Sequence, residues 1–234
     1  MATQYAFGQI ITSGLVLALD SADRNSYVSA SATWRNVSTS TFTSSFPNGV
    51  GYLSTNGGTL SFSSASLQSV TGSDLGSLSA FTVETWFNLT TVPTTAGAAA
   101  VVANAYIGTP TALNFSIGLN NSPTTANICV GFFDGAWRNT TGFAPVINTW
   151  YNVTGTYNGS VLTQYLNGAS QSTLNYAGTP SSSGAGVRIA RRWDTGAGAD
   201  HINGQIPIVR VYNRALTATE VLQNYNAQRS RFGL

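Results

Sequence analysis

Short β-forming segments, separated at close intervals by turn dipeptides, are the feature of this sequence that most restricts its fold. Three turns stand out, at Asp134-Gly135, Asn158-Gly159 and Asn167-Gly168, and each is flanked by β-forming residues. Asn-Gly and Asp-Gly favour the tight turns that join antiparallel strands. No alternation of strands and helices accompanies them, which argues against a parallel sheet. The chain is therefore predicted to be all-β, with two antiparallel sheets packed as a sandwich.

Alternation of apolar and polar residues locates the strands. In the segment 81–88, Val83 and Phe87 fall on one face, while Glu84 and Trp86 fall on the other. The same pattern predicts further strands at Leu15–Leu19, Thr59–Phe62, Ala112–Leu119, Asn127–Phe133, Tyr151–Tyr157, Val161–Leu166, Val187–Ala190 and Ile206–Asn213. Two regions rich in small residues, 90–100 and 176–186, interrupt this pattern and are interpreted as surface loops.

One short helix is predicted, at the C-terminus. Thr217 and Glu220 have the spacing of a capping box, in which each side chain bonds a backbone N–H near the other. Val221 and Tyr225 supply an apolar side to the segment that follows. We expect the helix to end near Gln228 and to leave a short tail.

Composition removes most forms of catalysis. All ten basic residues are arginine, so a lysine Schiff base and a lysine-containing phosphate loop are excluded. The chain has one histidine and one cysteine, and its only glutamates are Glu84 and Glu220. We therefore expect no catalytic residues and no enzymatic activity.

Charge and hydropathy bear on the partners. The formal net charge is +2 and the arginines are mostly scattered, whereas nucleic-acid binding usually needs a dense basic stripe. The sequence has no apolar run of about 20 residues, the length that spans a bilayer. Its first residues also lack the basic start of an export signal. We expect a protein that is made without a cleaved signal peptide, does not insert into membranes and does not bind nucleic acid.

Several segments resemble one family, in the family's order. The segment 203–220 resembles the closing motif of laminin-G-like, concanavalin A-like jelly rolls. Phe81–Phe87 and Trp150–Tyr157, the latter followed by Gln164–Gly168, are similar to central strands of the same family. The start of the chain, from Gly14, resembles a variant found in structural proteins of tailed phages. The resemblance implies a concanavalin A-like jelly roll over residues 14–228, between an N-terminal arm (1–13) and a C-terminal tail (229–234).

The phage resemblance implies a structural protein of the virion. The principal hypothesis is a non-catalytic capsid decoration or outer tail component, made in the host cytoplasm and attached through its termini to other virion proteins and to copies of itself. The hydrolase branch of the family uses an E-x-D-x-x-E strand, which is absent here. The candidate assembly contacts are Tyr5, Phe7, Ile10, Ile11, Arg229, Arg231 and Phe232.

The alternative is a carbohydrate-binding adhesion module that recognises host-surface glycans. Loops at the ends of a sandwich often meet ligands, and a tryptophan face beside polar groups can stack on a sugar ring. A second interpretation stays open, in which the rings of Trp137 and Trp193 only cover a sheet edge or lie in a subunit interface. Trp86 and Trp150 fall in core motifs and are expected to be packing residues. The candidate glycan-binding residues are Trp137, Trp193, Arg191, Arg192 and Asp194.

Calcium is the cofactor that the family implies. Many members bind it near the closing strand, but here Pro207 and Ile208 stand where acids are common. Calcium prefers six to eight oxygen ligands, usually including carboxylates, and the whole chain has eight acidic residues. We therefore expect no cofactor and no resident metal; if calcium binds, Asp194 and Asp200 are its candidate ligands.

Overall fold

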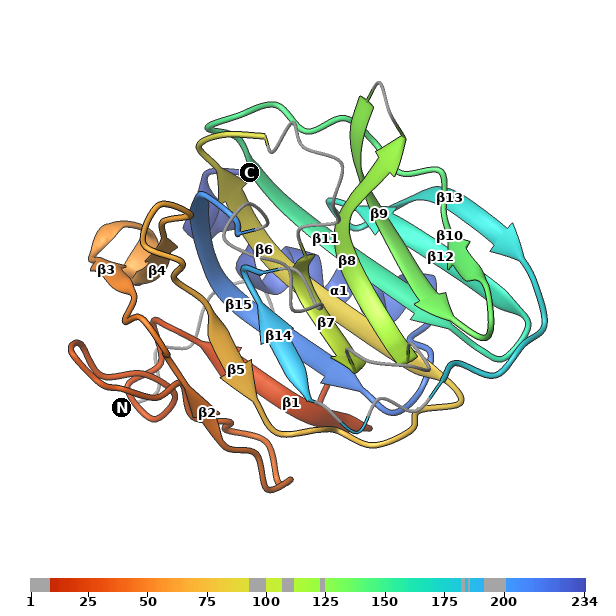
Figure 1. Cartoon of the computed structure of the whole chain (residues 1–234), viewed down its shortest axis with the longest axis horizontal. Helices are drawn as coiled ribbons and strands as arrows, with labels where there is room; N and C mark the ends of the chain where they lie inside the picture. The colour runs from red at the N-terminus through yellow and green to blue at the C-terminus, as the bar shows by residue number, and fades with distance from the viewer. Residues whose placement is uncertain are drawn as a thin grey trace.

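The computed structural model describes residues 9–92, 100–106, 112–122, 125–181, 184, 186–191 and 201–234. Two antiparallel sheets lie face to face, and one helix packs on the outside of the sandwich (Figure 1). The prediction of an all-β, two-sheet sandwich with one short C-terminal helix is confirmed. Within the described residues, no helix combines the length and apolar character needed to cross a membrane.

Eight strands form the larger sheet, called sheet A. They run in the order β13-β12-β11-β6-β15-β4-β3, and β1 also pairs with β15. The strands are β1 (Leu15–Asp20), β3 (Gly51–Leu53), β4 (Thr59–Phe62), β6 (Phe81–Leu89), β11 (Trp150–Tyr157), β12 (Val161–Leu166), β13 (Ala169–Asn175) and β15 (Gly204–Tyr212).

Seven strands form the second sheet, sheet B, in the order β10-β9-β8-β7-β14-β5-β2. Its two edges are therefore β10 and β2, which lie on opposite sides of the molecule (Figure 1). The strands are β2 (Ser44–Ser45), β5 (Val70–Gly72), β7 (Ala100–Tyr106), β8 (Ala112–Ser122), β9 (Thr125–Phe133), β10 (Trp137–Asn139) and β14 (Val187–Ile189).

The sequence pattern misses six strands: β2, β3, β5, β7, β10 and β13. Strand β7 begins at Ala100, inside a small-residue region that was predicted to be a loop. Its pairing with both β8 and β14 makes it a strand, because interior positions in a sheet override weak local preference. The other five strands are short or mostly polar, so alternation alone does not reveal them.

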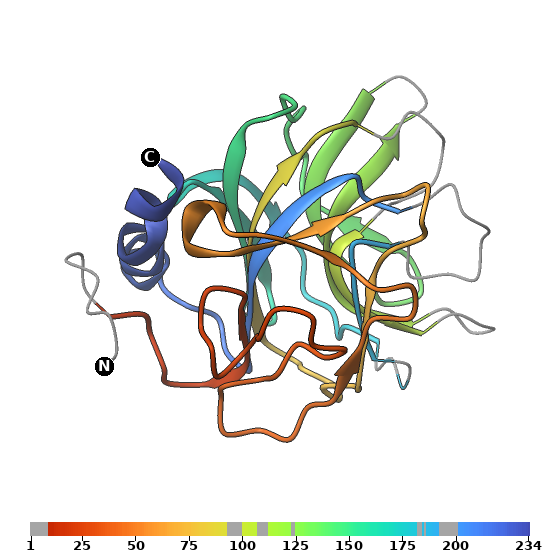
Figure 2. The same ribbon diagram turned by 90° about the vertical axis from the view of Figure 1, so that its left-hand side faces the viewer.

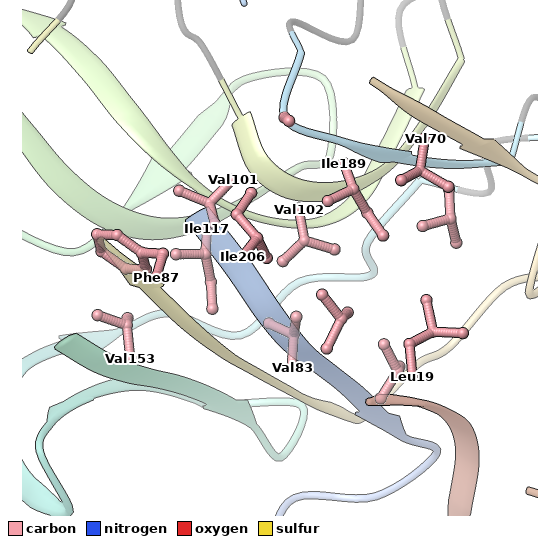
Figure 3. Close-up of a cluster of buried hydrophobic side chains, with 14 of the residues drawn as sticks. Leu19, Val70, Val83, Phe87, Val101, Val102, Ile117, Val153, Ile189 and Ile206 are labelled. Atoms are coloured by element: carbon pink, nitrogen blue, oxygen red, sulfur yellow. The ribbon is translucent and has the colours of Figure 1, made fainter. Parts of the chain in front are cut away.

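The core lies between the two sheets. Val83, Phe87 and Val153 of sheet A are fully buried against Val102 and Ile117 of sheet B (Figure 3). The predicted division of strand β6 is correct, because Val83 and Phe87 face this core while Trp86 belongs to a separate cluster on the other face. Each such side chain contributes about 1.5–3 kcal/mol when it is removed from water.

The outer face of sheet A is covered by the C-terminal segment. Helix α1 (Ala218–Gln228) is followed directly by the short 3-10 helix η2 (Arg229–Phe232), and both lie against this sheet (Figure 2). The ring of Phe232 stacks on Trp86 with centroids 4.3 Å apart and meets Trp150 at 4.7 Å. Residues 229–232 are thus part of the folded domain, and the core role predicted for Trp86 and Trp150 is confirmed.

A buried ion pair lies under the helix. Glu84 of β6 is fully buried, and its Oε1 accepts hydrogen bonds from Arg210 Nη1 (3.1 Å) and Asn152 Nδ2 (3.2 Å). Its Oε2 accepts a hydrogen bond from Asn224 Nδ2 of α1 at 2.9 Å. Asn224 Oδ1 in turn accepts from the backbone N–H of Ile11 at 2.8 Å. The network therefore joins the sheet, the helix and the N-terminal segment.

The predicted capping box at the start of α1 is present. The backbone N–H of Glu220 donates to Thr217 Oγ1, and the Glu220 carboxylate accepts from the backbone N–H of Thr217 at 2.8 Å. Arg214 Nη2 also donates to Glu220 Oε1 at 2.7 Å. The hydrogen bond from Arg214, followed by that from Thr217, lowers the pKa of Glu220 to about 2.

This lowered pKa predicts an acid-dependent loss of stability. The carboxylate stabilises the fold fully above its unfolded pKa of about 4.5, and the contribution disappears as the pH falls towards the folded value of about 2. Replacing Glu220 with glutamine, which can still complete the capping box but loses the ion pair with Arg214, should cost up to about 1 kcal/mol at pH 7. The difference between wild type and variant should shrink steadily between pH 4.5 and pH 2. Urea unfolding across this range measures it; a difference that does not depend on pH would contradict the assignment.

Candidate functional site

The hairpin that joins β9 to β10 presents an aromatic surface at one edge of sheet B. As predicted, Asp134-Gly135 forms its turn, in which the N–H of Asp134 donates to the carbonyl of Ala136 and Gly135 adopts φ +105°. The left-handed backbone at Gly135 favours glycine over other residues. Across the hairpin, Trp137 pairs with Phe133. The turn therefore sets Trp137 on the outermost strand.

Trp137 combines exposure with a fixed position. The residue is 46% exposed, although it lies within a hydrogen-bonded strand. The ring of Phe133 meets it edge to face, with centroids 5.2 Å apart. An aromatic pair of this kind contributes about 0.5–1.5 kcal/mol beyond burial. Trp137 is therefore a supported ring that is partly exposed to solvent.

A charged cluster lies on the other face of the hairpin from Trp137. Trp137 pairs with Phe133, which packs on a separate cluster outside the core, whereas Arg138 pairs with Phe132, which lies in the core between the sheets. Arg138 Nε donates to Asp134 Oδ1 at 2.9 Å, and the guanidinium carbon lies 3.8 Å from the centre of the Tyr176 ring. The Arg138 side chain is 29% exposed, and its guanidinium has five N–H donors in all. Arg138 is thus held in place by Asp134 and Tyr176 while part of it faces solvent. We call Trp137, Phe133, Asp134, Arg138 and Tyr176 the Trp137 platform.

The cluster also fixes the charge of its carboxylate. Partial burial would raise the pKa of Asp134, but hydrogen bonds from Tyr176 and Arg138 outweigh it and lower that pKa. The hydrogen bond to Asp134 raises the pKa of Tyr176. At neutral pH the hairpin therefore holds a carboxylate, a guanidinium and an uncharged phenol on one face and the partly exposed indole of Trp137 on the other. The indole can stack on one face of a sugar ring, and the polar groups on the other face of the hairpin can bond hydroxyl groups elsewhere on the same glycan.

Sequence reasoning identified Trp137 but missed its neighbours. The Asp-Gly turn contains a usable signal for two of them, because a tight hairpin brings Asp134 and Arg138 close together. Tyr176 comes from a segment beyond β13, and no local pattern connects it to the hairpin. Its position depends on the packing of the two sheets.

Of the other glycan-binding candidates, the structure describes only Arg191. Arg191 follows β14 and forms an isolated β-bridge with His201. Strands β9, β8 and β7 lie between β10 and β14, which puts Arg191 about 19 Å from Trp137 at the usual spacing of about 4.8 Å per strand. The remaining candidates, Arg192, Trp193 and Asp194, lie outside the described residues.

The described residues contain no cluster of three or more histidine, cysteine or acidic side chains of the kind that holds a metal ion. Both metal candidates, Asp194 and Asp200, lie outside these residues. The prediction about calcium therefore stays a prediction.

The terminal candidates for assembly lie partly within the fold. Ile11 packs beside Tyr212 and Val221, and Ile10 is partly buried. Arg231 donates to Asp20 Oδ1 and to the carbonyl of Gly58, both at 2.7 Å. With Phe232 stacked on Trp86, these side chains serve the domain's own packing, which counts against their use on a neighbouring protein. Arg229 is exposed, whereas Tyr5 and Phe7 lie outside the described residues.

The family is shown by comparison with known sequences. Residues 53–222 match the Laminin_G_3 model, which describes the concanavalin A-like lectin/glucanases superfamily. The chain belongs to this superfamily, and the predicted resemblance is confirmed at this level. No curated protein sequence is similar enough to count as a match.

Solved structures with the same fold share little sequence with this chain. The botulinum neurotoxin type G receptor binding domain has a TM-score of 0.69 at 15% identity, over 92% of this chain and 52% of that one. Domain 4 of AbnA, an extracellular arabinanase from Geobacillus stearothermophilus in complex with arabinotriose, has a TM-score of 0.65 at 14% identity, over 92% of this chain and all of that one. The binding domain of botulinum neurotoxin DC, in complex with SialylT, has a TM-score of 0.67 at 14% identity, over 93% of this chain and 52% of that one. The chain spans about half the length of the neurotoxin domains that it matches.

Proposed function

We propose that this chain is a non-catalytic carbohydrate-binding domain that adheres to glycans through the Trp137 platform. The observation that carries the proposal is Trp137, which is 46% exposed and is held by Phe133 on the edge strand of sheet B. An aromatic face packs against the C–H groups of a sugar, while arginine and carboxylate groups bond its hydroxyls. The similar structures solved with arabinotriose and with SialylT support this choice of ligand class.

The positions of the two glutamates support the non-catalytic part of the proposal. Glycoside hydrolysis generally uses a pair of carboxylic acids on either side of the scissile bond. Glu84 is buried in the network under α1, and Glu220 caps that helix. Asp134 is bonded to Arg138 and Tyr176 and is kept ionised, which does not suit a general acid. These acids therefore have structural partners where a hydrolase would need a free pair.

A place on a phage particle remains a prediction from the sequence resemblance. It depends on attachment through the termini, and Ile11, Arg231 and Phe232 are already engaged within the domain. The glycan-binding hypothesis, which began as the alternative, therefore takes precedence. A glycan-binding domain can also be carried on a virion, so the two hypotheses are compatible.

Replacing Trp137 with alanine should weaken glycan binding at least tenfold. Tryptophan at the centre of an interface commonly contributes 2 kcal/mol or more, and about 1.4 kcal/mol corresponds to a factor of ten. The assay is binding to an array that includes arabino-oligosaccharides, neutral hexose chains and sialylated ganglioside glycans.

A matched control is available for this test. Ile147 is also 46% exposed but lies away from the platform, so Ile147→Ala should bind like the wild type. Absence of binding by the wild type to any glycan would overturn the proposed function. Equal binding by wild type and Trp137→Ala would remove the platform as its site.

A further inference from the structure

A cavity lies at the opposite edge of the sandwich from Trp137. It has a volume of about 490 Å³ and lies between the loop after β1 and strand β3. Strand β3 ends sheet A on the side away from β13, and Figure 1 shows it across the molecule from β10. Sites for small molecules usually have volumes of about 300–1,000 Å³. The cavity is therefore large enough for one or two sugar residues.

Three aromatic rings form much of the cavity wall. Tyr27 lies 5.5 Å from Tyr52 and 6.1 Å from Phe46, measured between ring centres. Tyr27 and Phe46 are buried, whereas Tyr52 is partly exposed at the opening. We call this space the Tyr27–Tyr52 cavity.

The polar part of the lining carries hydroxyl groups and no formal charge. Ser29 and Ser31 line the cavity together with small residues and the aromatic rings, and no lining residue is acidic or basic. Burial raises the pKa of the Tyr27 hydroxyl, which is therefore uncharged at neutral pH. A ligand that carries a carboxylate or phosphate would lose hydration here and gain no opposite charge in return. The lining suits an uncharged molecule with both an apolar face and hydroxyl groups.

The loop that forms the cavity is held in a fixed and strained shape. Ala30 has φ +66°, a left-handed conformation that costs a residue with a Cβ about 1–2 kcal/mol. The N–H of Ser31 donates to the carbonyl of Val28 at 2.9 Å and closes this turn. At the base of the loop, Ser26 Oγ donates to the carbonyl of Arg35 at 2.6 Å. Strain of this kind persists where the surrounding structure holds it, often at binding sites.

The position of Tyr52 is also built into the backbone. Gly58 has φ +125°, and a Cβ at that position would lie 2.6 Å from the Tyr52 hydroxyl oxygen. The absence of a side chain at Gly58 therefore makes room for the Tyr52 ring. The ring is set by its strand and by this close approach, so little order has to be gained when a ligand binds.

We propose that the Tyr27–Tyr52 cavity is a second glycan-binding site, which takes a single uncharged sugar residue. The Tyr52 ring would stack on the apolar face of the sugar, and the hydroxyls of Ser29 and Tyr27 would bond its hydroxyl groups, while the Ser31 hydroxyl is held within the loop by Thr33. The site shares no residue with the Trp137 platform and lies at the other edge of the sandwich. A chain with both sites could hold two branches of one glycan, or two glycans on one surface, and gain from multivalency.

Saturation-transfer NMR with methyl glycosides tests this site. The probes are methyl galactopyranoside, methyl glucopyranoside and methyl arabinofuranoside as neutral sugars, with the methyl glycoside of sialic acid as the charged comparison. All four are measured on wild type and on Trp137→Ala, so that the platform cannot account for the signal. At least one neutral probe should bind both proteins. To Trp137→Ala, the sialic acid probe should bind at least tenfold more weakly than that neutral probe.

Two variants and a control locate the binding. Tyr52→Ala removes the stacking ring and should weaken neutral-sugar binding at least tenfold, whereas Tyr52→Phe should retain most of it. Ala32→Trp fills the cavity from an exposed position, so it should abolish binding without unfolding the domain. Leu53→Ala, at the exposed neighbour of Tyr52, should bind like the wild type.

Three outcomes would overturn the inference. The first is the absence of binding by every neutral probe. The second is binding of the sialic acid probe to Trp137→Ala that is as strong as binding of the neutral probe. The third is neutral-sugar binding that survives both Tyr52→Ala and Ala32→Trp. Because the readout is made in the Trp137→Ala background, failure of this site leaves the proposed function intact. If the Trp137 platform proves not to bind glycans, this test of the cavity is still valid.

Discussion

Replacement of Arg210 by methionine is expected to destabilise the domain by about 3–5 kcal/mol. Arg210 is almost fully buried, and its Nη1 lies 3.1 Å from the Oε1 of the fully buried Glu84. Methionine leaves that carboxylate without a counter-charge in a region that water does not reach. Removal of one partner of such a pair is far more damaging than removal of both. Urea unfolding monitored by tryptophan fluorescence measures the loss.

Two further variants show whether the buried charge is the cause. Adding Glu84→Gln to Arg210→Met removes the stranded charge and keeps an oxygen that can accept from Asn224 or Asn152. The double variant should therefore recover about 1–3 kcal/mol relative to Arg210→Met. Arg24 is exposed, so Arg24→Met should change the free energy of unfolding by less than about 0.5 kcal/mol. A double variant that is less stable than Arg210→Met would contradict this account.

The second large effect is expected at the C-terminus. Phe232→Ala should cost about 3–5 kcal/mol, the usual loss when a buried phenylalanine is truncated. The ring stacks on Trp86 and packs at a tilt against Trp150, so its removal opens a cavity over the outer face of sheet A. Thermal and urea unfolding report this loss, and the fluorescence of the folded state should change as well, because Trp86 becomes accessible to water.

Leu234 provides the control for the C-terminal variant. It lies two residues further along and is 42% exposed, so Leu234→Ala should alter stability by less than about 0.5 kcal/mol. If Phe232→Ala were as mild as Leu234→Ala, the C-terminal segment would be an appendage, as the sequence first suggested. A large loss confined to Phe232 would show that the segment belongs to the domain.

The sequence predicted those parts of the fold that depend on local pattern. Strands β4 and β12 have the predicted bounds, and the capping box places α1 correctly, because alternation, turn dipeptides and caps act over a few residues. Strand β7 and the return of Phe232 onto Trp86 were missed. Both depend on partners that are distant along the chain, and no local signal encodes them.

The candidate sites also combine features that local sequence predicts with features that depend on residues distant along the chain. Trp137 was predicted as a candidate because it follows the Asp134-Gly135 turn, and loops at the ends of a sandwich often meet ligands. The Tyr27–Tyr52 cavity was not predicted, since Tyr27, Phe46 and Tyr52 come from three separate segments that meet only in the folded protein. Glu84 was interpreted as one polar residue among others, although it forms a buried ion pair with Arg210, more than a hundred residues further along the chain.

The most direct test of the central claim follows the indole N–H signals of the five tryptophans by NMR while a glycan is added. Selective isotope labelling of tryptophan gives one signal for each indole, and the spectrum of Trp137→Phe identifies that of Trp137. We predict that the glycan bound most strongly on the array shifts the Trp137 signal in a saturable way and leaves the buried Trp34 and Trp86 unchanged. A glycan that binds while the Trp137 signal stays in place would contradict the account.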